Sequence, residues 1–250
     1  MIVFVHGGGW RLGTRHEFGP ELERPFERLV EAGFAVASVE YRLSAEAVFP
    51  AQVDDVAAAL RWLAAEGEAH GLDASRVVLW GESAGAALVA LVALRAEATP
   101  QAEATPRAGA AVRGVIDWYG PTDLPALGVD LDRLHDADCA EGRWLGGTIA
   151  GLPDAAVAAS AARQVARAVA AGAALPPFLI THGTADASVP PAQADLLAEA
   201  LRLAGGEVEL DLVAGADHRW LRAASAIEDV DRDALFDRAV AFARRAVDRA

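Results

Sequence analysis

The stretch RVVLWGESAGAALVALVALRA, residues 76–96, decides the fold class. Residues 76–80 read as a short strand that runs directly into Gly81, and residues 84–96 are rich in Ala, Leu and Val and predict a helix. Between them, GESAG at residues 81–85 matches the pattern G-x-S-x-G. Glycines two residues either side of Ser83 let the neighbouring backbone pass without a Cβ clash. This context predicts a sharp strand-to-helix turn that presents the hydroxyl of Ser83.

Outward from this turn, predicted strands and helices alternate along the chain. Alternation of this kind is typical of an α/β protein, a mostly parallel sheet with helices on both faces. The sequence predicts one domain over residues 1–250, with 124–174 as a helical, cap-like insertion over one end of the sheet. A polar loop at 97–108 repeats Glu-Ala-Thr-Pro. The other predicted strands are 2–5, 34–39, 112–118, 178–181 and 208–213, and predicted helices include 20–32, one that opens at Pro50, 191–204 and a C-terminal helix.

Composition excludes several classes of partner. The 250 residues carry a net charge of −14, which would repel nucleic acid and anionic membranes. The apolar run 84–94 is far shorter than the roughly 20 residues of a membrane span. Cys139 is the only cysteine, and no Cys/His cluster has zinc-ligand spacing, so we expect no disulfide and no metal. No signal peptide is visible, which favours a cytoplasmic protein.

A glycine cluster follows the first predicted strand. In HGGGW, residues 6–10, residues without side chains let backbone N–H groups turn toward an oxyanion, together with the N–H group of Ala84. A phosphate-binding loop is the alternative interpretation. No G-x-x-x-x-G-K pattern with a following Ser or Thr exists here, so the oxyanion role is favoured.

Two further residues complete a catalytic arrangement with Ser83. An acid is expected after a late strand and a base on a loop near the end, in the order Ser, Asp, His. Asp186 and His218 meet this order: Asp186 would orient the imidazole of His218, which would take the proton of Ser83. Asp123 and Asp217 are rival acids. Of the other histidines, His182 is expected to bond local backbone and His6 to orient the glycine loop.

These motifs together resemble the HGGGW-type esterase/lipase branch of the α/β-hydrolases, near its feruloyl-esterase-like and acetyl-esterase-like members and related to the hormone-sensitive-lipase and kynurenine formamidase groups. The resemblance covers nearly the whole chain. It implies a triad of Ser83, Asp186 and His218, oxyanion donors at Gly8, Gly9 and Ala84, and pocket positions at Trp10, Trp118 and Tyr119. It also implies an ion pair of Arg42 with Asp54. The motifs are HGGGW (6–10), VEYRLSAEAVFPAQVDDVAAALRWL (39–63), GLDASRVVLWGESAGA (71–86), IDWYGPTDL (116–124), WLGG (144–147), HGTADASVP (182–190) and GADH (215–218).

The chain departs from this resemblance at its beginning. Proteins of that branch have two further strands before the HGGGW strand, and no such stretch precedes it here. The strand at 34–39 is therefore expected to be an exposed apolar edge, which is an aggregation hazard. Met1 is the only methionine. These two observations suggest the hypothesis that Met1 is an internal position of a longer reading frame.

The resulting functional prediction is a serine hydrolase that cleaves small carboxylic esters through an acyl-enzyme intermediate, without a cofactor. Its partner would be a small-molecule ester, and the sequence leaves the oligomeric state open. Two alternatives remain: an arylformamidase, because a triad also attacks amides, and a catalytically silent binding module with the same fold.

Overall fold

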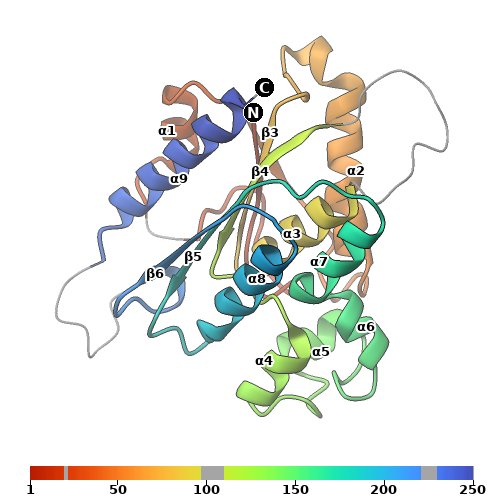
Figure 1. Cartoon of the computed structure of the whole chain (residues 1–250). Coiled ribbons are helices and arrows are strands. Elements are labelled where there is room, and N and C mark those ends of the chain that lie inside the picture. Colours follow the sequence, from red (N-terminus) through yellow and green to blue (C-terminus); the bar gives the residue numbers. More distant parts are fainter. Residues whose placement is uncertain (20–21, 97–109, 221–229, 250) are drawn as a thin grey trace.

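The computed structural model describes residues 1–19, 22–96, 110–220 and 230–249. Within these residues six strands form one parallel sheet in the order β2-β1-β3-β4-β5-β6 (Figure 1). The predicted α/β architecture is therefore confirmed. The loop predicted at 97–108 lies outside the described residues. The strands are β1 (Ile2–Val5), β2 (Val36–Val39), β3 (Val77–Glu82), β4 (Val112–Trp118), β5 (Phe178–Gly183) and β6 (Val208–Val213).

Helices cover both faces of the sheet. Helices α1 and α9 lie on one face, and α2, α3 and α8 lie on the other (Figure 1). Short 3₁₀ turns, η1 (Gly67–His70) and η2 (His218–Trp220), occur in two of the loops. The helices are α1 (Pro25–Glu31), α2 (Ala51–Glu66), α3 (Ala84–Ala96), α4 (Leu124–Asp130), α5 (Ala140–Leu145), α6 (Pro153–Ala158), α7 (Ala161–Ala170), α8 (Ala192–Leu203) and α9 (Arg232–Asp248).

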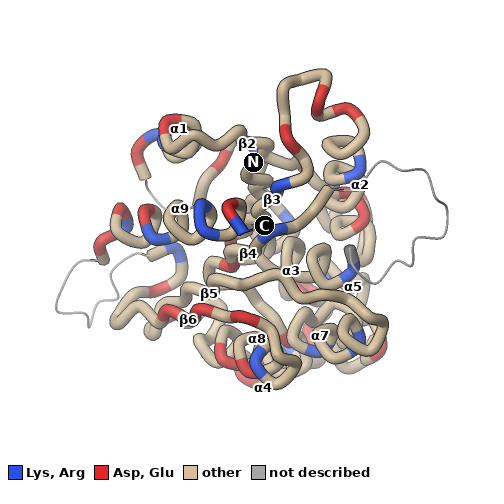
Figure 2. Tube along the Cα trace, turned by 45° about the horizontal axis from the view of Figure 1, so that its top comes forward, with Lys and Arg blue, Asp and Glu red and all other residues tan. Residues whose placement is uncertain are grey.

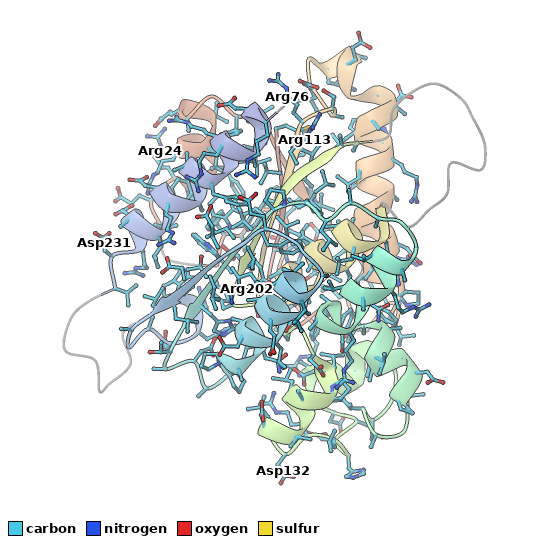
Figure 3. All side chains as sticks on the ribbon, viewed as in Figure 1. Arg24, Arg76, Arg113, Asp132, Arg202 and Asp231 are labelled. Carbon is cyan, nitrogen blue, oxygen red and sulfur yellow. The ribbon has the colours of Figure 1, made fainter. Side chains whose placement is uncertain are left out.

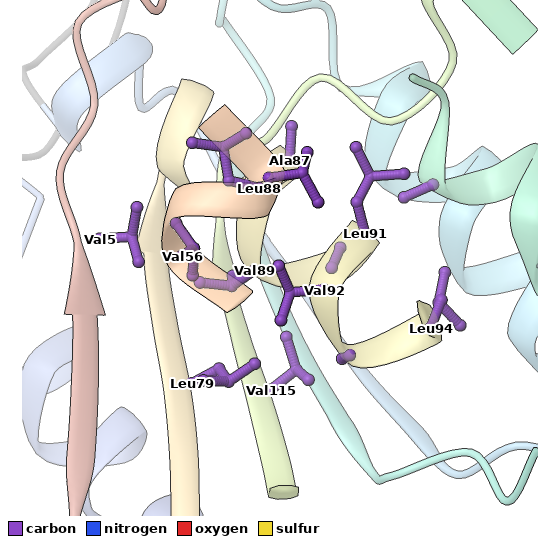
Figure 4. Close-up of a cluster of buried hydrophobic side chains, with 14 of the residues drawn as sticks. Val5, Val56, Leu79, Ala87, Leu88, Val89, Leu91, Val92, Leu94 and Val115 are labelled. Carbon is purple, nitrogen blue, oxygen red and sulfur yellow. The ribbon is translucent and has the colours of Figure 1, made fainter. Parts of the chain in front are cut away.

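The side chains of each strand alternate between the two faces, as the period of two of a strand requires. In β1, Ile2 and Phe4 pack toward α1 and α9, whereas Val3 and Val5 pack toward α2 and α3. All four are fully buried, because a parallel sheet covered on both faces has no solvated side. Figure 4 shows the apolar cluster around α3, with Val5, Leu79 and Val115 from the strands and Val56 from α2.

The carboxyl ends of the strands form one rim of the sheet, and the helices of segment 124–174 begin beyond it. In Figure 3, Arg76 and Arg113 mark the amino ends of β3 and β4, and Asp132, just after α4, lies at the opposite end of the molecule. The last helix of the segment, α7, packs against α3 and α8 in the helical layer. The division into one domain with an insertion stays a prediction.

Two local predictions were wrong. The helix predicted over 20–32 begins at Pro25, because proline has no N–H group to bond and favours the first helical turn. Arg42 pairs with Asp55 at 2.8 Å rather than with Asp54. Successive residues of a helix point about 100° apart, so Asp54 faces away from Arg42 and pairs with Arg95 on α3 at 3.2 Å.

The two edge strands of the sheet, β2 and β6, have different surroundings. Among the described strands, β2 pairs only with β1, and a groove of about 700 Å³ lies beside it, lined by residues that include Phe26, Val30 and Val36. At the opposite edge, acidic residues of β6 meet arginines of α9, as in the Arg245–Glu209 pair at 2.8 Å (Figure 2). No helix in the described part of the chain is long and apolar enough to cross a membrane.

Candidate active site

Ser83 occupies the turn between β3 and α3 with a left-handed backbone, φ 51°. Its N–H group donates to the carbonyl of Trp118 at the end of β4, 2.8 Å away, which fixes the turn to the sheet. The two glycines of the motif are sterically required. A Cβ on Gly81 would collide with the backbone of Gly85, and a Cβ on Gly85 would collide with the carbonyl of Val5. The sharp turn predicted from GESAG is present.

The structure brings Ser83, His218 and Asp186 together, although they are far apart in the chain. Nε2 of His218 lies 3.0 Å from Oγ of Ser83, and Nδ1 of His218 lies 2.6 Å from Oδ2 of Asp186. An ionised carboxylate can only accept, so the proton of the neutral imidazole belongs on Nδ1. Nε2 is then free to accept the proton of the Ser83 hydroxyl. This is the arrangement that a general base and its orienting acid require.

Asp186 is fully enclosed and is held by several donors. Its Oδ1 accepts from the N–H groups of Ser188 at 2.8 Å and Val189 at 2.9 Å. Its Oδ2 accepts from His218 and also lies 3.3 Å from Nε2 of His182. Burial alone raises the pKa of Asp186, but the hydrogen bonds from His182 and His218 outweigh it and hold the pKa well below its usual range. The carboxylate therefore stays ionised at neutral pH.

The rival acids lie in other environments. Asp123 caps the N-terminus of α4 by accepting from the N–H group of Ala126 at 3.0 Å, and it pairs with Arg163 at 2.7 Å. Oδ1 of Asp217 is buried and has no hydrogen-bond partner among the described residues. Of the three candidate acids, only Asp186 forms a hydrogen bond with the imidazole of His218 among the described residues.

The glycine loop passes beside Ser83. A Cβ placed on Gly7 would lie 3.3 Å from Cβ of Ser83, and Gly8 and Gly9 have positive φ angles of 111° and 59°. Among the described residues, no acceptor is present for the N–H groups of Gly8, Gly9 and Ala84. Free N–H donors can stabilise a developing oxyanion, and the oxyanion role of these three residues stays a prediction.

His6 and Tyr41 support the glycine loop through three contacts. The buried ring of His6 stacks on Tyr41 with 4.3 Å between ring centroids, and Nδ1 of His6 lies 2.8 Å from the carbonyl of Gly7. The hydroxyl of Tyr41 donates to the carbonyl of His6 at 3.1 Å. Burial lowers the pKa of His6, so its ring is neutral at neutral pH and supports the loop without charge.

The three aromatic residues predicted near the pocket have different surroundings. Trp10 stacks on Trp144 at 3.9 Å, and this pair connects the glycine loop to α5. Trp118 is fully buried within the aromatic core on the α9 face. Tyr119 contacts the ring of His218 with 4.8 Å between centroids. A pocket role for these residues stays a prediction.

Sequence reasoning missed Glu82, the residue before Ser83. Its carboxyl group is buried, and Oε2 accepts from the N–H group of Gly19 at 2.6 Å. Burial raises the pKa of Glu82 to about 8, although the Gly19 N–H group and the charge of Arg219 act in the opposite direction. The signal was available, because a glutamate at the end of the otherwise apolar strand VVLWGE is unusual.

The model of the BD-FAE family matches residues 1–201. The chain belongs to the BD-FAE family. BD-FAE proteins are α/β-hydrolases of the esterase and lipase type.

Individual relatives of this BD-FAE chain include esterase LipQ of Mycobacterium tuberculosis, 28% identical over 207 residues that make up 82% of the chain and 46% of LipQ. Ethyl acetate hydrolase of Pseudomonas putida is 27% identical, over 92% of the chain and 69% of that protein. The propionate-bound structure of the thermophilic esterase Est2 from Thermogutta terrifontis has a TM-score of 0.70 and 26% identity, over 98% of the chain and 82% of that structure. The chain thus spans less than half the length of LipQ.

Proposed function

We propose that this protein is a serine hydrolase that cleaves carboxylic esters with short acyl groups. The observation that carries the proposal is the chain of hydrogen bonds from Asp186 through His218 to Ser83, at 2.6 and 3.0 Å. Family membership agrees with this activity, since BD-FAE proteins belong to an esterase and lipase family.

The reaction follows from the positions of these groups. Oγ of Ser83 attacks the ester carbonyl while its proton passes to Nε2 of His218. The N–H groups of Gly8, Gly9 and Ala84 stabilise the oxyanion, each at a value of about 3 kcal/mol in the transition state. The C–O bond to the alcohol then breaks, and the alcohol leaves with the proton from His218. Water, deprotonated by the same imidazole, attacks the acyl-enzyme and releases the acid, which regenerates Ser83.

The expected substrate is a small-molecule ester, and no cofactor takes part in the steps above. Two related proteins support a short acyl group by their names: one is an ethyl acetate hydrolase, and the structure of another holds propionate. Trp10 and Trp144, stacked beside the glycine loop, are the side chains we propose as the acyl-side wall.

A series of p-nitrophenyl esters tests this proposal, with Ser83→Ala as the matched control. We expect kcat/KM to be highest for acetate, propionate or butyrate and to fall for octanoate, with the Ser83→Ala variant inactive on all of them. N-formylkynurenine in the same assay separates an ester hydrolase from an arylformamidase. Faster turnover of the formamide than of any ester would overturn the ester assignment, and no turnover of either substrate would favour a binding module.

A further inference from the structure

Gly19 lies between the residue that precedes Ser83 and the residue that follows His218. Its N–H group donates to Oε2 of Glu82 at 2.6 Å. Its carbonyl accepts two hydrogen bonds from the guanidinium of Arg219, from Nε at 2.9 Å and from Nη2 at 2.6 Å. One glycine, 63 residues from Glu82 and 200 residues from Arg219 in sequence, therefore connects the segments that carry the two reacting side chains.

The neighbouring Phe18 anchors this glycine to the core. The ring of Phe18 stacks on Phe4 of β1 at 4.6 Å between centroids. It also meets the edges of Trp80 on β3 and Trp118 on β4, at 5.7 and 5.9 Å. Because these three partners belong to central strands, Phe18 fixes Gly19 relative to the sheet from which Ser83 projects.

The turn that carries His218 has an unfavourable backbone that needs external support. Arg219 and Trp220 both have left-handed φ angles, 73° and 62°, which cost energy in residues with a side chain. Trp220 is buried against Tyr119, whereas the His218 side chain is partly exposed. The bidentate bond from Arg219 to Gly19 is therefore suited to hold the turn in this conformation.

The position also requires glycine for steric reasons. A Cβ on residue 19 would overlap Oε2 of Glu82 and would lie 3.1 Å from the hydroxyl of Tyr119. Any side chain at residue 19 would push the carboxyl group of Glu82 away from the N–H group of residue 19, which donates to it. Glu82 has little space to move, because it is fully buried.

We propose that Gly19, Glu82 and Arg219 form a positioning bridge that holds His218 within hydrogen-bonding distance of Ser83. These three are positioning residues, since they act on the reaction through the placement of His218. The inference rests on the proposed function, because it assigns them a role in the same hydrolytic site. Misplacement of a catalytic group by about 1 Å can cost on the order of a hundredfold in rate, so loss of the bridge is measurable.

The test compares Arg219→Ala, Arg219→Lys and Gly19→Ala with the wild type. Arg244→Ala is the matched control. Arg244 on α9 also donates to a backbone carbonyl, that of Ala32 at the end of α1, at 3.1 Å, so it makes the same kind of bond between other elements. Three quantities are measured: kcat and KM for p-nitrophenyl acetate, the second-order rate of reaction with a fluorophosphonate, and the midpoint of thermal unfolding.

We expect Arg219→Ala and Gly19→Ala to lower both kcat and the fluorophosphonate rate by about ten- to a hundredfold, with KM within about twofold of wild type. Arg219→Lys should recover part of the loss, because its ammonium group can donate one bond to the Gly19 carbonyl. The double variant Gly19→Ala/Arg219→Ala should lose far less than the product of the two single losses, since both break one bridge. Arg244→Ala should keep wild-type rates.

Wild-type kcat and fluorophosphonate rate in Arg219→Ala would overturn the bridge, as would an effect on KM alone. If Arg219→Ala fails to fold, Gly19→Ala decides by the same readouts, because it keeps every charged side chain. A wild-type protein that neither hydrolyses the ester nor reacts with the fluorophosphonate would instead overturn the proposed function. The two failures are therefore distinguishable.

Discussion

Nε2 of His182 lies 3.3 Å from Oδ2 of Asp186, the oxygen that also accepts from His218. His182 is fully buried, and the same Nε2 lies 2.8 Å from the carbonyl of Val189. Both neighbours are acceptors, so Nε2 of His182 carries a proton and acts as a donor. The sequence predicted the bond to local backbone but not the second contact. Asp186 is thus held between two imidazoles.

The first prediction concerns this second imidazole. Replacement of His182 by Leu removes a donor to a buried carboxylate, and such charge-assisted bonds contribute about 1.5–3 kcal/mol. We therefore expect His182→Leu to lower kcat/KM for p-nitrophenyl acetate about tenfold or more. His182→Gln keeps an N–H donor and should lose less. Equal losses in the two variants, or none in His182→Leu, would contradict a role for the donor.

The second prediction separates Asp186 from its rival Asp123. Asp186→Asn should lower kcat roughly ten-thousandfold, because an amide stabilises the wrong tautomer of His218. Asp123→Asn should leave kcat near wild type and lower the free energy of unfolding by at most about 1 kcal/mol through the lost ion pair with Arg163, since Asn caps a helix about as well as Asp. Steady-state kinetics and urea unfolding measure both effects. A larger loss of kcat in Asp123→Asn would reject Asp186 as the acid.

The third prediction is a pH dependence of stability from Glu82. Its pKa is about 8 in the folded chain and 4.5 as a reference value, so between these pH values the folded state holds a proton that the unfolded state releases. The free energy of unfolding therefore falls as pH rises through this window, by up to about 1.4 kcal/mol per pH unit. Glu82→Gln has no carboxyl group to titrate at this position, so it lacks this pH-dependent contribution to the free energy of unfolding. Relative to wild type, the variant should be more stabilised at pH 9 than at pH 5 in urea unfolding; an equal difference at both pH values would refute the buried, protonated carboxyl.

Most of the fold could be predicted because it depends on short-range patterns. The apolar runs and their stops located every described strand, and the predicted strand 76–80 with Gly81 after it located the turn at Ser83. The ends of the helices and the ion-pair partners of charged side chains were harder to predict from the sequence. The start of α1 depended on Pro25, and the partner of Arg42 depended on which of two adjacent aspartates faces it across the helix surface.

Some residues of the candidate site could likewise be predicted from the sequence, and others could not. Ser83, Asp186 and His218 each follow the carboxyl end of a predicted strand, so their convergence could be expected from the topology of a parallel sheet. The bridge through Gly19 could not be expected, since it uses the backbone of a residue 200 positions from Arg219 and leaves no motif. The contact of His182 with Asp186 left only a weak signal, a spacing of four residues in HGTAD.

The role of Ser83 as nucleophile is tested most directly by the covalent reaction of the intact protein with a fluorophosphonate, with the modified residue located by peptide mass spectrometry. We predict one adduct, on Ser83, that is absent from Ser83→Ala and forms far more slowly in a variant without the imidazole, His218→Ala. Turnover of p-nitrophenyl acetate should fall about a millionfold in Ser83→Ala. An unlabelled Ser83 in an active enzyme, or a Ser83→Ala variant with less than a tenfold loss of turnover, would show that Ser83 is not the nucleophile.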